Sequence, residues 1–530
     1  MSSKGADNTM KTKQTRSAFS TLHILTGLVA IGTVLVVFAG YAGERTGTAE
    51  ASRKRLPSFH SPHGSVTEAW VNQIDGPAHG SDHGHDVKTA GNVFVTGWIE
   101  TTTGNPDSYT VKYSPDGDLL WENTYAGSAT GTDYGYALTL DLSGNVYVAG
   151  FGNSTNPATF DIFVLKYDAD GNSVWTQRWT SPMTNYSAYA YSIAVDNQGN
   201  VFTTGFESDG FTDGEFITLK FNSSGVLQWA TPYNGSTSSI DYANHIVVDS
   251  DGNSYITGWS GGANNLHDMT TIKYDPDGNE LWVRRYNGSA DDNDYAYWLA
   301  LDGSGNVYVA GQSVETGSDN DITTIKYAPN GDEIWVRHYD GPAHGYDAGQ
   351  AIAVDADGNA YVTGNHTLAT GLECVTLKYS AAGDLLWTAS FNGPDASGGV
   401  FISIALDDTA NAYVTGFVFS GGAGDSATVK YDTNGIEQWA QLYDGPGHSS
   451  DGAYAIAVDN NHNVAIAGYS TGAGTDYDYT TIKYVETATP TPTPTVTPSV
   501  TPTPTPAPTA TPTPRPAPSP RPRPTPRPRP

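Results

Sequence analysis

A repeated unit of 52–55 residues runs through most of this 530-residue chain and constrains its fold more than any other feature. Repeats of this length are typical of propellers, solenoids and other arrays. An Asn in a GNVYVTG-like run recurs at Asn92, Asn145, Asn200, Asn253, Asn306, Asn359, Asn411 and Asn463. A Lys before Tyr or Phe recurs at Lys112, Lys166, Lys220, Lys273, Lys326, Lys378, Lys430 and Lys483. Tryptophan recurs at Trp70, Trp121, Trp175, Trp229, Trp282, Trp335, Trp387 and Trp439.

Four short apolar stretches occur in each unit, and glycine-rich turns separate them. Examples are AIAVD at 351–355, NAYVTG at 359–364, TIKY at 271–274 and ELWVRRY at 280–286. Their alternation and their β-branched and aromatic content predict strands. The DPDGNE-like turns place glycine where a tight hairpin needs a left-handed residue. We therefore expect no ordinary helix between residues 65 and 484.

Eight units of four antiparallel strands predict an all-β fold, an eight-bladed β-propeller. The small-residue first strand should lie innermost, where bulky side chains would not fit, and the tryptophan strand outermost. Strand 65–73 should complete the blade begun at 451–484, so that the ring closes without a free strand edge. A parallel solenoid is the alternative, but it would not need its first strand to match a gap in its last unit.

Two of these runs, KYDPDGNELW and VDSDGNSYITG, resemble the bacterial β-propeller repeat family known as SBBP repeats. The resemblance covers the chain from Trp70 to Tyr484. Ala410 and His462 depart from it where other units have a turn glycine, and Lys88 departs where they have Asp. The resemblance implies an exported or surface protein, generally without an assigned reaction.

The two ends of the chain differ from its body. Residues 1–20 form a basic segment, and the apolar run 21–43 is long enough to span ~30 Å, which predicts a signal peptide or a membrane anchor. Residues 44–64 are expected to be a linker and 65–487 the propeller. The Pro/Thr/Arg-rich tail 488–530 should be a disordered, extended spacer. We expect an exported protein that is secreted, membrane-anchored or held at the cell surface.

Charge and cysteine content narrow the function classes. Residues 56–487 contain 13 basic and 53 acidic side chains, which disfavours nucleic acid as a partner. Cys374 is the single cysteine, so no intramolecular disulfide can form. We also expect the body of the protein to be monomeric. A quinone-dependent dehydrogenase is one alternative function, but many such enzymes place adjacent cysteines at the cofactor, which this chain does not have.

Histidines in the blade-to-blade links are candidate metal ligands. The links DGPAHGSDHGHD at 75–86 and DGPGHSSD at 444–451 contain His79, His83, His85 and His448. Histidine with carboxylate suits zinc, although a hydrogen-bonding surface loop is the favoured interpretation. The D-x-D-G-N strings look like calcium loops, but they lack the bidentate Glu and sit where hairpin turns are needed. No other cofactor is expected.

Aspartates also recur at fixed places in the unit. Asp82, Asp133, Asp241, Asp294, Asp347 and Asp451 start six inner strands. They could ring the channel mouth and attract cations, but acceptance of backbone amides in the links is favoured. The third-strand Lys and an Asp that ends the inner strand should form a repeated structural contact, on the face of the ring that carries the short, uniform turns.

Connections between the second and third strands vary and share a face with the blade-to-blade links. Variable loops on a rigid scaffold are where binding usually resides. The sequence therefore predicts an exported, non-catalytic propeller that presents an acidic, aromatic-rich loop face to a protein or other surface ligand. The alternatives are the quinone-dependent enzyme and a glycan-binding propeller that uses exposed Tyr and Trp.

Overall fold

A computed structural model of the chain describes residues 65–127, 131–153, 159–210, 214–235, 241–262, 266–393, 398–420, 423–474, 476–487 and 515–521. The chain divides into two compact units, Met1–Thr487 and Ala488–Pro530. The predicted basic segment, apolar run and linker at 1–64 lie outside the described residues, as does most of the tail. In the part of the chain that is described, no helix is long and apolar enough to cross a membrane.

All regular structure in the described residues is β-strand, arranged as eight four-stranded antiparallel sheets. Blades 1 to 3 consist of β2 (His83–Ala90), β3 (Asn92–Thr102), β4 (Asn105–Tyr113) and β5 (Leu119–Tyr125); β6 (Asp133–Leu140), β7 (Val146–Asn153), β8 (Phe160–Tyr167) and β9 (Ser173–Trp179); β10 (Ser187–Val195), β11 (Val201–Ser208), β12 (Gly214–Phe221) and β13 (Leu227–Tyr233). Blades 4 to 6 consist of β14 (Tyr242–Val248), β15 (Ser254–Gly261), β16 (His267–Tyr274) and β17 (Glu280–Tyr286); β18 (Tyr295–Leu301), β19 (Val307–Val314), β20 (Asn320–Tyr327) and β21 (Glu333–Tyr339); β22 (Ala348–Val354), β23 (Ala360–Leu368), β24 (Gly371–Tyr379) and β25 (Leu385–Phe391). Blades 7 and 8 consist of β26 (Gly399–Leu406), β27 (Ala412–Ser420), β28 (Ala423–Tyr431) and β29 (Glu437–Tyr443); β30 (Asp451–Val458), β31 (Val464–Thr471), β32 (Tyr477–Thr487) and β1 (Ser65–Ile74).

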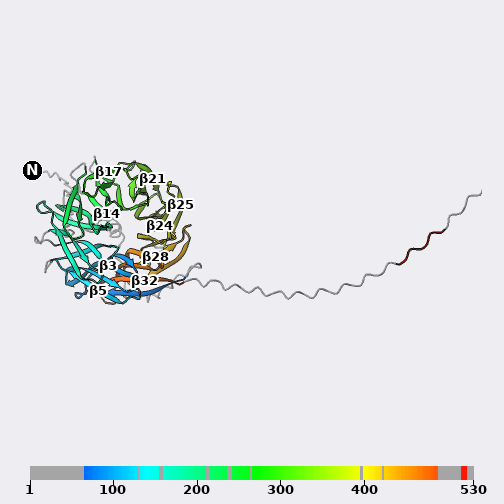
Figure 1. Ribbon diagram of the computed structural model, residues 1–530, viewed down its shortest axis with the longest axis horizontal. Coiled ribbons are helices and arrows are strands. Elements are labelled where there is room, and N and C mark those ends of the chain that lie inside the picture. The colour runs from blue at the N-terminus through cyan, green and yellow to red at the C-terminus, as the bar shows by residue number, and fades with distance from the viewer. Residues whose placement is uncertain are drawn as a thin grey trace, which may run out of the picture. The chain divides into compact units, whose positions relative to one another are not determined.

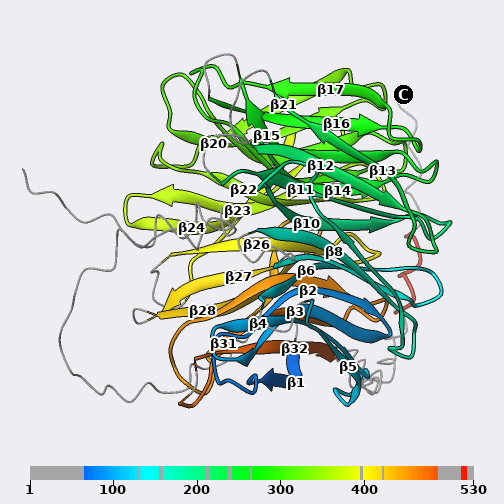
Figure 2. The same cartoon turned by 90° about the vertical axis from the view of Figure 1, so that its left-hand side faces the viewer.

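The ring closes through the first strand of the chain, as the sequence predicts. β1 pairs antiparallel with β32, from Ser65 opposite Thr487 to Ile74 opposite Tyr479. Figure 1 shows the blades around a common centre, and Figure 2 shows β1 beside β32. The eight-bladed propeller is therefore confirmed, and an open solenoid is not what the chain forms.

Opposite faces of the ring carry the two kinds of connection. Within each meander, the links between blades and the connections between second and third strands leave on one side, which we call the loop face. They contact each other there, as when the Ala78 amide donates to the Glu100 carbonyl at 3.1 Å. The hairpins between first and second and between third and fourth strands lie on the turn face.

A repeated clasp on the turn face joins neighbouring blades. The outer-strand tryptophan of one blade donates its indole N–H to a carbonyl in the next blade's third-to-fourth-strand turn, and the third-strand lysine usually reaches the same carbonyl. In blade 4, for example, Trp282 Nε1 and Lys273 Nζ lie 3.1 and 3.3 Å from the Pro329 oxygen. At the ring closure, Trp70 and Lys483 clasp Pro115 of blade 1 at 3.1 and 3.3 Å. The predicted contact of the third-strand lysines thus goes mainly to the neighbouring turn, and Asp lies 3.8–4.0 Å away in blades 5, 6 and 8.

Blade 8 lacks a third-to-fourth-strand turn because its fourth strand comes from the other end of the body. A carboxylate takes the place of the missing carbonyl. Glu486 Oε1 accepts from Trp439 Nε1 at 2.9 Å and from Lys430 Nζ at 2.6 Å. The last blade is therefore clasped in the same way as the others, through a different acceptor.

Candidate functional site

The first strand of every blade contains a β-bulge, and these bulges define the wall of the central channel. Each pairing of first and second strand shifts register by one residue at the same place, as between Gly84 and Asp86. A bulge leaves one extra residue unpaired and re-aims its side chain. The bulged residues are His85, Tyr136, Tyr191, Asn244, Tyr297, Gln350, Ile402 and Tyr454.

A cavity of about 500 Å³ lies in the channel, and all eight bulged residues line it. The other lining residues follow them along the first strands toward the turn face, for example Lys88 and Val458. The first strands are innermost, as expected. The expectation that bulky side chains would not fit there is wrong, because the bulge gives large aromatic residues access to the channel.

One wall of the cavity combines flat rings with polar atoms. His245 stacks on Trp298 with ring centroids 3.9 Å apart and an interplanar angle of 26°. Trp298 remains 37% exposed. Asn244 donates from Nδ2 to the Ala296 carbonyl at 2.8 Å. Its Oδ1 and His245 Nδ1 are buried atoms without a hydrogen-bond partner among the described residues.

The charged groups of the cavity neutralise each other. Lys88 Nζ donates to Asp86 Oδ1 at 2.6 Å, and the Leu138 amide donates to Asp86 Oδ2 at 2.9 Å. Next to them, His85 Nδ1 lies 3.0 Å from the Tyr136 carbonyl oxygen. Burial lowers the pKa of His85 to about 4, and burial together with the Lys88 charge lowers the pKa of His245 to about 3. Both imidazoles are therefore neutral hydrogen-bonding groups at pH 7.

The structure does not gather the four predicted metal-ligating histidines into one group: His83 and His85 both contact Trp98 and Tyr454, whereas His79 and His448 lie in different links. His79 Nδ1 lies 2.6 Å from Asp75 Oδ2, and His448 Nδ1 lies 2.9 Å from Asp444 Oδ2, each within its own link. His83 stacks on Trp98 at 4.9 Å, and burial lowers its pKa to about 3. Within the described ranges, the groups of three carboxylate, imidazole or thiol side chains close enough to share an ion contain only aspartates.

The six predicted inner-strand aspartates are fully buried beneath the links. Each accepts a backbone amide of its own link, and five also accept one from the second strand of their blade or its following loop. Asp294, for example, accepts from Gly288 at 2.6 Å and from Val314 at 2.9 Å. Burial raises the pKa of Asp294 to about 7 and of Asp82, Asp133, Asp241, Asp347 and Asp451 to about 6.

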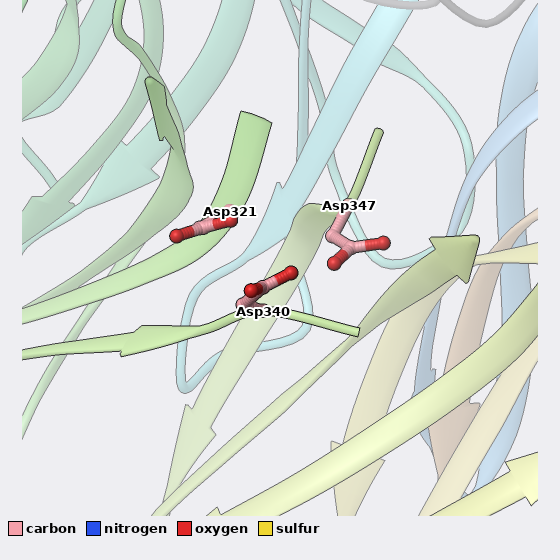
Figure 3. Close-up of side chains that lie close together, drawn as sticks. All are labelled: Asp321, Asp340 and Asp347. Carbon is pink, nitrogen blue, oxygen red and sulfur yellow. The ribbon is translucent and has the colours of Figure 1, made fainter. Parts of the chain in front are cut away.

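Two of these aspartates belong to carboxylate clusters that the sequence analysis missed. Asp321, Asp340 and Asp347 have ligand-type oxygens within 4.8 Å of one another, and Figure 3 shows their side chains side by side. The second cluster consists of Asp425, Asp444 and Asp451. These clusters are the described residues best suited to hold a cation. An acidic residue at the start of the third strand was the available signal, since it recurs in every unit.

Arginines occupy the comparable region of other blades. Arg178 in β9 lies 3.4 Å from Asp133 and 3.6 Å from Asp161. Arg285 in β17 lies 3.2 Å from the third-strand Asp268. In the Asp321 cluster, by contrast, Asp340 Oδ2 lies 2.5 Å from His344 Nδ1. This link is consequently more negative than the links beside the arginines.

The D-x-D-G-N strings form capped hairpin turns. Asp249 Oδ1 accepts the amides of Asp251 and Asn253 at 3.0 and 2.9 Å, and its Oδ2 accepts Asn253 Nδ2 at 2.8 Å. The carboxylate therefore serves its own turn, which is the usual role of Asp at such positions.

An aromatic arc runs along the loop-face ends of the first and second strands from blade 1 to blade 5. Rings stack across strands within blades, as in Tyr242 and Trp259 at 4.5 Å. They also contact between blades, as in Trp98 and Tyr134 at 5.1 Å and Trp259 and Tyr295 at 5.4 Å. The arc consists of His83, Trp98, Tyr134, Phe151, Tyr189, Phe206, Tyr242, Trp259 and Tyr295.

The closed ring, the inter-blade clasps and the lined channel define an eight-bladed β-propeller protein. Residues 228–267 match the repeat family described as SBBP, Beta-propeller repeat, which supports the resemblance seen in the sequence. A bacterial origin is not shown. A viral relative, the uncharacterized WD repeat-containing protein L264 of Acanthamoeba polyphaga mimivirus, is 23% identical over 515 residues. That alignment covers 67% of this chain and 36% of the viral protein, so the chain spans little more than a third of that relative.

Several solved structures resemble the chain at low similarity. A protein of unknown function from Dyadobacter fermentans has a TM-score of 0.35 and 11% identity, covering 80% of this chain and 99% of that one. The polysaccharide lyase Uly1 has a TM-score of 0.42 and 11% identity, covering 78% and 99%. The propeller domain of the Trilobed protease from Pyrococcus furiosus has a TM-score of 0.39 and 9% identity, covering 66% and 93%. Likenesses this weak carry no argument about function.

Proposed function

We propose that the protein is exported and that its propeller is a non-catalytic binding module whose loop face receives a basic partner protein. The observation that carries this proposal is the Asp321, Asp340 and Asp347 cluster at a blade-to-blade link on the loop face, where Asp340 is exposed and the carboxylates of Asp321 and Asp347 are buried close to it. The apolar run at 21–43 supports export.

The charge of the body supports a basic partner. Its 13 basic and 53 acidic side chains give a field that attracts positive charge, and such fields steer association and select partners. Arg178 and Arg285 reduce this field locally in blades 2 and 4. The side of the ring at blades 5 to 8, which contains both carboxylate clusters, is therefore the preferred docking region.

Glycan binding is the second candidate, and the aromatic arc favours it. Trp98, Tyr134, Tyr189 and Tyr295 in the arc are partly exposed. Aromatic rings with a polar tip offer a flat apolar surface together with a hydrogen-bonding group. Burial keeps His83 in the arc neutral, because it lowers the pKa of that histidine to about 3.

Binding of the full-length chain to a polylysine peptide at 50 and 300 mM salt tests the first proposal. We expect Asp340→Asn, which neutralises the exposed carboxylate of the cluster, to weaken binding several-fold at low salt. Asp268→Asn is the matched control, because it removes a carboxylate that Arg285 already pairs. Binding that depends neither on the salt concentration nor on the Asp340→Asn substitution would reject the basic partner. A glycan array with a Trp98→Ala control tests the second candidate.

A further inference from the structure

We propose that the link between blades 5 and 6 holds a calcium ion, bound by the carboxylates of Asp321, Asp340 and Asp347. This inference goes beyond the proposed docking of a basic partner, because the ion would bind whether or not such a partner exists. Asp321 lies at the start of β20, whereas Asp340 follows β21 and Asp347 precedes β22. Figure 3 shows the Asp321 carboxylate directed toward the other two.

The spacing of the three carboxylates suits calcium. One oxygen of each lies within 4.8 Å of the others. Calcium binds oxygen ligands at ~2.3–2.6 Å, so one ion between these oxygens would reach all three with small side-chain movements, whereas magnesium requires bonds of ~2.0–2.1 Å. A hydrogen-bonded water stays ~2.7–2.8 Å from an oxygen. The ion therefore fits between buried carboxylates where a water molecule does not.

Asp321 is a buried carboxylate with one unpartnered oxygen. The residue is 3% exposed. Its Oδ2 accepts a hydrogen bond from the Ser318 hydroxyl at 3.0 Å, but its Oδ1 has no hydrogen-bond partner among the described residues. Burial raises the pKa of Asp321 and of Asp347 to about 6, so both are mainly ionised at pH 7.5. Burying an unpaired anion is costly, and a cation held in the cluster would remove that cost.

Other blades meet the same need with an arginine. Arg178 in blade 2 and Arg285 in blade 4 each stand three residues after the outer-strand tryptophan, and they lie 3.6 and 3.2 Å from the third-strand aspartates of their own blades. Blade 5 has His338 at this position, and its Nδ1 lies 3.4 Å from Glu315 Oε1. Burial lowers the pKa of His338, so it is neutral at pH 7.5. Asp321 therefore lacks the side-chain cation that its counterparts have, and a bound ion would supply the charge.

Asp340 connects the cluster to solvent. Its side chain is 33% exposed, and its Oδ2 lies 2.5 Å from His344 Nδ1, which leaves the other oxygen for an ion. Asp347 is held beneath the link by the amides of Gly341 and Thr367, which donate to its two oxygens. Calcium takes six to eight oxygen ligands, so water molecules on the exposed side of Asp340 would complete its coordination.

The number of calcium ions bound per chain tests the proposal. We would remove metal from the full-length chain with a chelator and titrate calcium by calorimetry at pH 7.5. We expect Asp321→Asn, which keeps the shape of the side chain and removes its charge, to bind one ion fewer than the parent. Asp268→Asn is the matched control, because it changes the same position in blade 4, where Arg285 supplies the positive charge, and it should bind as many ions as the parent. Ions at the second carboxylate cluster would be counted alike in all three chains.

A second variant keeps the test valid if Asp321→Asn fails to fold, as judged by circular dichroism. Asp340→Asn changes the exposed carboxylate of the cluster and should also bind one ion fewer. No calcium bound to the parent, an unchanged ion count in the folded cluster variants, or the loss of an ion in Asp268→Asn would overturn the proposal. Polylysine binding can be measured with the chelator present, so failure of the calcium site and failure of the basic partner are distinguishable.

Discussion

The ring closure can be tested with one methyl group. Gly117 lies in the turn between β4 and β5 with φ +92°, and a Cβ built on it would lie 2.7 Å from the Trp70 ring. Gly117→Ala should therefore strain the backbone and displace the indole that clasps blade 8 to blade 1. Gly91→Ala is the matched control, since Gly91 has φ +78° and no atom lies within 4 Å of its Cβ position.

Both glycines have a positive φ, but only at Gly117 would a new Cβ meet the Trp70 ring. An alanine in the left-handed conformation lowers the stability of the folded state by ~1–2 kcal/mol, and the reduced conformational freedom of the unfolded chain offsets ~0.4–1 kcal/mol of this loss. Gly91→Ala should therefore lower the free energy of unfolding by about 1 kcal/mol. Overpacking adds ~1–3 kcal/mol for Gly117→Ala, and weakening the bond from Trp70 Nε1 to Pro115 adds about 1 kcal/mol. We expect a total loss of about 3–5 kcal/mol for Gly117→Ala.

Urea unfolding of the full-length chain, followed by tryptophan fluorescence and circular dichroism, measures both losses. In a Trp70→Ala background, the cost of Gly117→Ala should fall to that of Gly91→Ala, because the displaced ring is gone. Equal destabilisation by the two glycine substitutions in the parent chain would refute the clasp as a determinant of ring closure.

Three further predictions address the last blade and the buried titratable groups. Glu486→Ala should lower the free energy of unfolding in urea by about 1–3 kcal/mol, because it leaves Lys430 Nζ and Trp439 Nε1 without their acceptor. Glu486→Gln keeps an acceptor oxygen and should lower the free energy of unfolding less. Equal losses in the two variants would contradict this role of Glu486. Burial lowers the pKa of His85 from 6.5 to about 4. The stability that the neutral histidine contributes is therefore present above pH 6.5 and is lost as the pH falls through 4. We expect the melting temperature of His85→Phe to drop less between pH 7 and pH 5 than that of the parent chain. Burial raises the pKa of Asp294 from 3.8 to about 7, so the stability that its protonated form contributes is present below pH 3.8 and is lost as the pH rises through 7. Asp294→Asn should therefore lack the gain in melting temperature that the parent chain shows on acidification from pH 7.5 to 5. A variant with the same pH profile as the parent would contradict the shift.

Much of the fold could be predicted because its determinants are local and repeated. Strand alternation, the hairpin glycines and the period of 52–55 residues each depend on a few consecutive positions, and eight copies leave little ambiguity. The place of Trp70 ahead of the first complete unit also predicted the closing strand. The turn conformation is kept even where the turn glycine is replaced. Ala410 and His462 adopt the left-handed conformation, with φ 62° and 63°.

The candidate sites could be predicted only in part. The inner-strand aspartates were found because they recur, but spacing does not show that Asp340 and Asp347 meet Asp321 of the preceding blade's third strand. The link histidines looked like a ligand set because they are close in sequence. In the structure, His79 and His448 each pair with a carboxylate four residues earlier, and His83 packs among aromatic rings.

The amino-acid sequence by itself determined the strands, the blade count and the closing strand, because each follows from periodicity and turn chemistry within a unit. Only the tertiary structure decided what the centre contains. A β-bulge is a mismatch between two paired strands, so its extra residue becomes visible only in their register. Ring closure then brings Tyr136, Asn244, Tyr297 and Tyr454, which belong to different units, around one cavity.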